Sequence, residues 1–194
     1  MPKKPISRQE RKVSENDLSV KNRKRQQEIT SMDVRPATKH DEKSLLKMRP
    51  YAKCGLGFPC SEEILLAVNN GKVLGAVSVC HKDISYVYGE WKGGFEQCLN
   101  NLIKKVSSGW ISKLYVFPEH RHRGIGTKLV EEAVEHLKQK NFNEVYAGIY
   151  VKNKFRNVSQ HVFEKNGFAK IGSCICPLSK GHCRGTLLKK TIQS

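Results

Sequence analysis

A turn rich in glycine and arginine, set between a strand pattern and a helix pattern, constrains the fold of this chain more than any other feature. Residues 110–117 form a predicted strand that Pro118 ends, because proline cannot donate to a sheet ladder. Residues 119–126 form the turn and read Glu-His-Arg-His-Arg-Gly-Ile-Gly. The helix after it has an apolar stripe at helical spacing, made of Leu129, Val130, Ala133, Val134 and Leu137. With a further strand predicted at 145–151, the pattern indicates a βαβ unit.

The other readable segments extend this unit into a single α/β domain with a mixed sheet. Asp41 is the expected N-cap of a first helix, and a second short helix is predicted at 157–166. Asn69-Asn70-Gly71 is typical of a hairpin turn. Residues 84–108 show no clear period. The remaining predicted strands are 33–38, 64–68, 73–79, 168–176 and the segment around Leu187–Leu188.

Charge divides the chain into two parts. The whole sequence carries 35 Lys+Arg against 18 Asp+Glu, which gives +17 and predicts affinity for polyanions such as nucleic acid or the ribosome. Residues 1–29 hold nine basic and four acidic side chains, a net +5, and almost no large apolar residues. Such a segment buries too little surface to offset its ordering entropy, so we expect a disordered basic tail at 1–29 and a folded domain at 30–194.

Targeting signals and cysteines bear on the compartment. The start of the chain has no apolar run that could form a signal-peptide core, and no stretch of about 18 apolar residues occurs elsewhere. We therefore expect a cytoplasmic protein without a membrane span. Seven cysteines, an odd number, are then expected to remain thiols rather than form a disulfide framework.

The turn at 121–126 has the properties of a pyrophosphate-binding site. The first N–H groups of a helix lack intrahelical acceptors, and the helix dipole places positive potential behind them. Gly124 and Gly126 remove side chains that would keep an anion from the backbone. Arg121, His122 and Arg123 add positive charge at the same place. These features predict that a phosphate group binds here.

Two other phosphate-binding motifs fit less well. A dinucleotide-binding G-x-G-x-x-G motif needs a third glycine where this chain has Leu129, and an acidic residue near the end of the next strand, where it has Gly148, Ile149 and Tyr150. A P-loop needs Gly-Lys-Ser/Thr, whereas Gly126-Thr127-Lys128 has a different order.

The motifs resemble those of the GNAT acetyltransferases. Arg121-x-x-Gly124-x-Gly126 after a predicted strand matches the family's R/Q-x-x-G-x-G/A motif, and residues 163–168 (Phe-Glu-Lys-Asn-Gly-Phe) are similar to its Y-E-K-x-G-F segment. Val34 to Thr38 is similar to the family's first strand, so the resemblance spans roughly 32–191.

The resemblance implies an acetyl-CoA-dependent N-acetyltransferase in which an amine attacks the thioester directly. It implies that Leu114, Tyr115 and Val116 line the pantetheine arm and that a backbone N–H near Val116 polarises the acetyl carbonyl. The implied phosphate ligands are Arg121, His122, Arg123, Gly124, Ile125, Gly126 and Thr127, with Asn153 or Asn157 near the family's usual asparagine.

The acid-base half of the implied site is incomplete. The family's usual tyrosine corresponds to Phe163, which has no proton to give, and positions that often carry a catalytic glutamate hold Trp110 and Gly148. The candidates for proton transfer are Tyr150 and Tyr115 as acids and Glu119 or His120 as a base through water, with Glu90 as a further candidate.

No metal is expected to take part. Cys174, Cys176, His182 and Cys183 carry ligand chemistry suited to zinc, but their spacing is not that of a standard zinc site, so we expect buried thiols. Two functions therefore remain open: an N-acetyltransferase with an unknown amine acceptor, or a catalytically silent acyl-CoA- or polyanion-binding module with the same fold.

Overall fold

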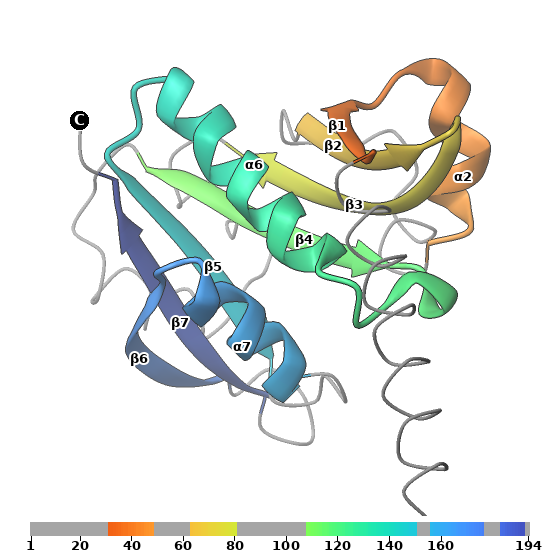
Figure 1. Cartoon of the computed structure of the whole chain (residues 1–194). Helices are drawn as coiled ribbons and strands as arrows, with labels where there is room; N and C mark the ends of the chain where they lie inside the picture. Colours follow the sequence, from red (N-terminus) through yellow and green to blue (C-terminus); the bar gives the residue numbers. More distant parts are fainter. Residues whose placement is uncertain (1–30, 49–62, 81–107, 151–155, 177–182, 193–194) are drawn as a thin grey trace, which may run out of the picture.

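The computed structural model describes residues 31–48, 63–80, 108–150, 156–176 and 183–192 (Figure 1). The basic tail at 1–29, most of 84–108 with Glu90, and Asn153 lie outside these residues.

The described residues form one seven-stranded mixed sheet with the strand order β1-β2-β3-β4-β5-β7-β6. β4 and β5 are parallel, and every other neighbouring pair is antiparallel. The prediction of a mixed α/β sheet is confirmed. The strands are β1 (Asp33–Pro36), β2 (Glu63–Asn69), β3 (Lys72–Cys80), β4 (Gly109–Val116), β5 (Glu144–Tyr150), β6 (Ala169–Cys176) and β7 (Cys183–Thr191).

The hairpin between β2 and β3 forms where it was predicted. Asn70 and Gly71 both have positive φ angles, 48° and 73°, as a two-residue hairpin turn requires. This turn fixes the pairing of Asn69 with Lys72 at the end of the ladder.

Two helices cover one face of the sheet. The 15-residue α6 (Ile125–Gln139) contacts β2, β3 and β4, while α7 (Arg156–Lys165) lies beside α6 and contacts β5 (Figure 1). The predicted stripe of α6 is buried as a whole, with Leu129, Val130, Ala133 and Leu137 fully inaccessible. The stripe packs on β3 residues such as Val77 in the larger core cluster.

The opposite face of the sheet is covered by the first helical segment. The 3-10 turn η1 (Lys39–Asp41) leads into α2 (Glu42–Leu46), and Leu45 of α2 packs with Leu66 and Ala76. Leu65 and Val77, the neighbours of these two strand residues, belong to the cluster under α6. This alternation follows from the two-residue period of a β-strand.

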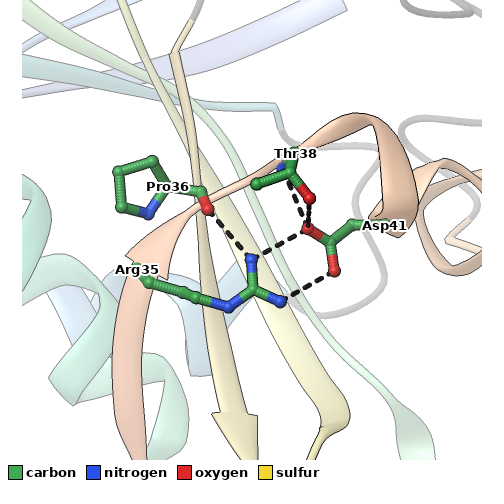
Figure 2. A network of polar contacts seen from close by, with 4 residues as sticks. All are labelled: Arg35, Pro36, Thr38 and Asp41. Carbon is green, nitrogen blue, oxygen red and sulfur yellow. Dashed lines mark hydrogen bonds and ion pairs between the residues drawn. The ribbon is translucent and has the colours of Figure 1, made fainter.

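Asp41 is the N-cap residue of α2, as predicted, but its carboxylate bonds to other groups. It has helical backbone angles at the N-cap of α2 and makes no side-chain cap bond there. Instead its carboxylate accepts from the Thr38 N–H (2.8 Å) and hydroxyl (2.9 Å), and from both terminal nitrogens of Arg35 (2.8 and 2.9 Å; Figure 2). The bidentate bond to Arg35 of β1 and the bonds to Thr38 hold the pKa of buried Asp41 well below its usual range. Asp41 is also the third residue after Thr38, the N-cap of η1, and there the two residues form a capping box.

No helix among the described residues is both long enough and apolar enough to cross a membrane. Cys80 of β3 is buried and takes part in no disulfide bond.

Candidate functional site

The two parallel strands β4 and β5 pair over three residues and then diverge. Gly109, Trp110 and Ile111 of β4 pair with residues 145–147 of β5. Past this point β4 continues to Val116 paired with β3, and β5 continues to Tyr150 paired with β7 (Figure 1). Among the described residues, no strand pairs with the far half of β4 along its edge toward β5.

The backbone of β4 presents amide groups along this edge. The Phe117 N–H donates to the Leu74 carbonyl (3.0 Å), and the Tyr115 carbonyl faces Gly75, so both groups point toward β3. Successive residues of a strand point their N–H and C=O groups to opposite edges. The N–H groups of Leu114 and Val116 therefore face the side where β4 and β5 diverge.

The N-terminus of α6 lies at the end of β4, after the 3-10 turn η2 (Pro118–His120). Gly124 is the N-cap and has a φ of +84°, a conformation that a side chain would strain. The first intrahelical bond runs from the Lys128 N–H to the Gly124 carbonyl, so the N–H groups of residues 125–127 have no acceptor within the helix. The first turn has no acidic residue and no side-chain cap bond, which leaves its positive potential available to an anion.

The first turn of α6 packs against the core on one side. Ile125 is buried in the core, so its backbone alone can meet a phosphate. A Cβ added at Gly126 would lie 3.8 Å from Val116 and 3.8 Å from Val162 of α7, which is ordinary van der Waals contact. Gly126 is therefore not required by the packing of the fold, whereas Gly124 is required by its backbone angle.

Sequence reasoning missed Asn166, which connects α7 to this turn. Its Nδ2 donates to the Thr127 carbonyl (3.3 Å) and to the Val162 carbonyl (2.9 Å). Its own carbonyl accepts from the Lys190 Nζ of β7 (2.7 Å). The available signal was the Asn-Gly pair at a predicted helix end, because Gly167, with a φ of +80°, ends α7.

The basic side chains near this turn have different hydrogen-bond partners. Arg121 donates its Nε to the Val116 carbonyl (3.0 Å), and Arg123 donates to the Glu119 carbonyl (2.8 Å). His122 is exposed, with a φ of +60°. Lys128 forms ion pairs with Glu132 (2.8 Å) and Glu131 (3.3 Å) on α6, and its hydrogen bond to Glu132 raises its pKa.

The catalytic candidates lie in different surroundings. Tyr115 packs on the face opposite α6, edge-to-face with Phe117 at a centroid distance of 5.5 Å. Glu119 is exposed in η2, while His120 beside it is buried. Tyr150 is the last residue of β5, and the structure describes only its backbone. Phe163 is 5% exposed and packs edge-to-face on Phe168, inside the core under α6.

Asn157 is the second residue of α7 and is exposed. Trp110 is buried and stacks on Tyr146 of β5 at a centroid distance of 6.0 Å, which is a packing role. In the part of the chain that the structure describes, no group of three His, Cys, Asp or Glu residues is placed to hold a metal. The side chains of Cys174, Cys176, His182 and Cys183 lie outside that part.

A strand that leads to a glycine-containing helix N-terminus without a side-chain cap agrees with the motif on which the resemblance rests, and a comparison with protein families decides the family. Residues 27–168 match the acetyltransferase (GNAT) family. The chain belongs to this family. It is therefore an acyltransferase, and acetyl-CoA is the co-substrate, as predicted.

Solved structures share the GNAT fold at low sequence identity. A GNAT acetyltransferase from Elizabethkingia anophelis, solved with acetyl-CoA bound, is 15% identical, with a TM-score of 0.56 over 84% of this chain and 99% of its own. Ribosomal-protein-alanine N-acetyltransferase from Brucella melitensis is 18% identical, with a TM-score of 0.59 over 82% and 99%. An N-acetyltransferase from Staphylococcus aureus Mu50 is 16% identical, with a TM-score of 0.57 over 84% and 99%. Among curated proteins, no sequence matches this chain.

Proposed function

We propose that this protein transfers the acetyl group of acetyl-CoA to a primary amine. One observation carries the proposal: the strand edge of Leu114 and Val116, left without a partner by β5, runs directly to the uncapped N-terminus of α6. An extended amide-containing chain that ends in a pyrophosphate fits an unpaired strand edge followed by a helix N-terminus.

The residues present fit the groups of acetyl-CoA. The backbone N–H groups of 124–127, with Arg121, His122 and Arg123 nearby, hold the pyrophosphate. Leu114, Tyr115 and Val116 pair with the pantetheine arm. Asn157, the second residue of α7, and Asn153 complete the proposed set of cofactor ligands.

Acetyl-CoA supplies an activated thioester, so the protein needs no covalent nucleophile of its own. The N–H of Leu114 or Val116 donates to the acetyl carbonyl and stabilises the negative charge that develops on its oxygen. This contribution comes from the backbone and requires no special side chain.

Proton transfer is assigned to groups other than Phe163, which has no ionisable atom. Tyr150, Tyr115 and Glu119 are the candidates for exchanging protons with the amine and the departing thiolate. General acid-base catalysis contributes about 10²–10⁴-fold, so an enzyme that lacks the family's tyrosine can still turn over. Tyr115→Phe keeps the ring and its packing and removes the proton; an unchanged rate would exclude Tyr115 as the acid.

The test is a thermal melt of the full chain with and without excess acetyl-CoA. At about 100 times the Kd, binding adds about 2.7 kcal/mol, which raises Tm by roughly 5–10 °C for a chain of this length. ATP and NAD are the controls and should give no shift. A shift restricted to acetyl-CoA leads to a screen of amine acceptors, in which cationic acceptors are disfavoured by the net charge of +17. No shift with any acyl-CoA contradicts the proposal.

A second candidate function, beside acyl transfer, is the binding of polyanions such as nucleic acid or the ribosome. The nine basic residues of 1–29 favour it. Deleting 1–29 should preserve the acetyl-CoA shift and weaken salt-dependent binding to RNA, measured by a titration at several salt concentrations. RNA binding that survives the deletion would place the contact on the folded domain.

A further inference from the structure

The side chain of Arg121 turns back along β4. Its Nε donates to the Val116 carbonyl at 3.0 Å in a part-buried position. Its guanidinium carbon lies 5.7 Å from the centroid of the Tyr115 ring, within range of a cation–π contact. Both contacts are to the strand, and together they fix the direction of the side chain.

The carbonyl that Arg121 binds belongs to a peptide unit held at both ends. The Val116 C=O and the Phe117 N–H form one planar group. The N–H end donates to the Leu74 carbonyl of β3 at 3.0 Å, and the C=O end accepts from Arg121. On that side an adjacent strand would normally supply the donor, but β5 pairs with β4 no further than Ile111. Among the described residues, the Arg121 Nε–H therefore supplies the donor that a neighbouring strand would otherwise provide.

We propose that Arg121 is a positioning residue: its Nε–H holds the end of β4 so that the N–H groups of Leu114 and Val116 face the thioester. The inference deepens the proposed function and rests on it. Arg121 then contributes through the donor at its ε position, whereas a phosphate ligand would contribute through its positive charge. The two roles can be separated because the donor and the charge can be removed independently.

Three variants make this separation. Arg121→Gln places an amide N–H the same number of bonds from Cα as the arginine Nε and removes the charge. Arg121→Lys keeps a positive charge, on an atom one bond farther from Cα than the arginine Nε, and has a methylene at the ε position. Arg121→Met keeps the side-chain length up to the ε position and has neither an N–H donor nor a charge. Lys72→Met, in an exposed position at the start of β3, is the matched control for the loss of one positive charge.

The first measurement needs no cofactor. The carbonyl ¹³C chemical shift of Val116 reports the hydrogen bond it accepts, and it is recorded for the five proteins by NMR without ligand. We expect the shift of wild type to be kept in Arg121→Gln and Lys72→Met and to change in Arg121→Lys and Arg121→Met. An unchanged Val116 shift in Arg121→Met overturns the inference, whatever the fate of the proposed function.

The second measurement follows acetyl-CoA itself. Calorimetry gives Kd at low and high salt, and isotope-edited infrared spectroscopy of [1-¹³C]acetyl-CoA gives the stretch of the bound carbonyl. Loss of one net hydrogen bond corresponds to about a fivefold change. We expect Arg121→Lys and Arg121→Met to weaken binding about fivefold and to move the carbonyl band toward that of free acetyl-CoA, while Arg121→Gln stays within about twofold.

The opposite ranking of the variants by acetyl-CoA affinity would identify Arg121 as a phosphate ligand. In that case Arg121→Lys keeps its affinity for acetyl-CoA, whereas Arg121→Gln loses affinity and its Kd depends less on salt. If the carbonyl band is also unmoved in all variants, the positioning role is overturned. Wild-type protein that binds no acetyl-CoA contradicts the proposed function, and the cofactor-free Val116 shift then still decides what Arg121 does to the strand.

Discussion

Two strand-to-helix junctions in this protein have the same order of elements but differ in whether an acidic side chain lies at the turn. β1 leads through η1 into α2, and β4 leads through η2 into α6, with an arginine close to each 3-10 turn. At the first junction Arg35 pairs with Asp41, which also accepts from the Thr38 N–H. At the second, Arg121 binds a backbone carbonyl, and the first turn of α6 has no acid.

The difference teaches what makes a helix N-terminus available to a ligand. At the first junction the Asp41 carboxylate accepts from Arg35 and from the Thr38 N–H, so the anion beside this arginine belongs to the protein itself. At the second junction the first turn of α6 has no acid, and the N–H groups of 125–127 have no acceptor within the helix. The proposed acetyl-CoA site thus depends as much on a residue type that is missing as on those that are present.

The largest expected effect follows from supplying that acid to the second junction. Gly126→Glu places a carboxylate at the proposed pyrophosphate site, and we expect acetyl-CoA affinity to fall at least about a hundredfold, or about 2.7 kcal/mol. The fold should persist, because an acid in the first turn of a helix is stabilising by about 0.3–1 kcal/mol. Thermal melts with and without acetyl-CoA measure both. An unchanged affinity would remove the site assignment.

Removing the acid from the first junction should lower stability without affecting acetyl-CoA binding. Asp41→Ala leaves Arg35 and the Thr38 N–H without their partner and should cost about 2–3 kcal/mol. Chemical denaturation measures the loss. Glu42→Ala is the matched control, because Glu42 is the neighbouring acid and is exposed. Equal effects of the two substitutions would contradict the role given to Asp41.

The pH dependence of stability should carry the signature of Asp41. Its pKa is depressed in the folded protein, mainly by the hydrogen bond from Arg35, so its contribution is fully present above about pH 4 and is lost as the pH falls further. Asp41→Asn should therefore be less stable than wild type at pH 6, and the gap should narrow at pH 3. The free energy of unfolding at both values tests this, and a constant gap would exclude it.

The smallest effects distinguish the two glycines of the second junction. Gly124→Ala forces a side chain into the left-handed region and should cost about 1–2 kcal/mol. Gly126→Ala meets ordinary contacts in a helical position and should gain up to about 1 kcal/mol. Denaturation of the pair checks the sign of each change. Equal signs would mean that the two glycines serve the same purpose.

Local patterns sufficed for most elements of the fold. The hairpin at Asn70–Gly71, the buried stripe of α6 and the strands on either side of it were all predicted, because period, turn chemistry and capping are short-range properties. Asp41 is the N-cap residue of α2 as predicted, but the partners of its carboxylate were not predicted, because one of them, Arg35, comes from a neighbouring strand.

The motif around Gly124 and Gly126, taken with its strand-helix context and with residues 163–168, predicted an anion site, the family and the co-substrate, and the family and the co-substrate are confirmed. The arrangement of the groups around it came from tertiary structure alone. The divergence of β4 from β5, the Asn166 bridge to Thr127 and the return of Arg121 to Val116 all join residues through backbone edges and packed faces, and such contacts leave no period in the sequence. A turn motif can be read from the chain because its energetics are local, whereas the partner of an unpaired strand edge is fixed only when the sheet is assembled.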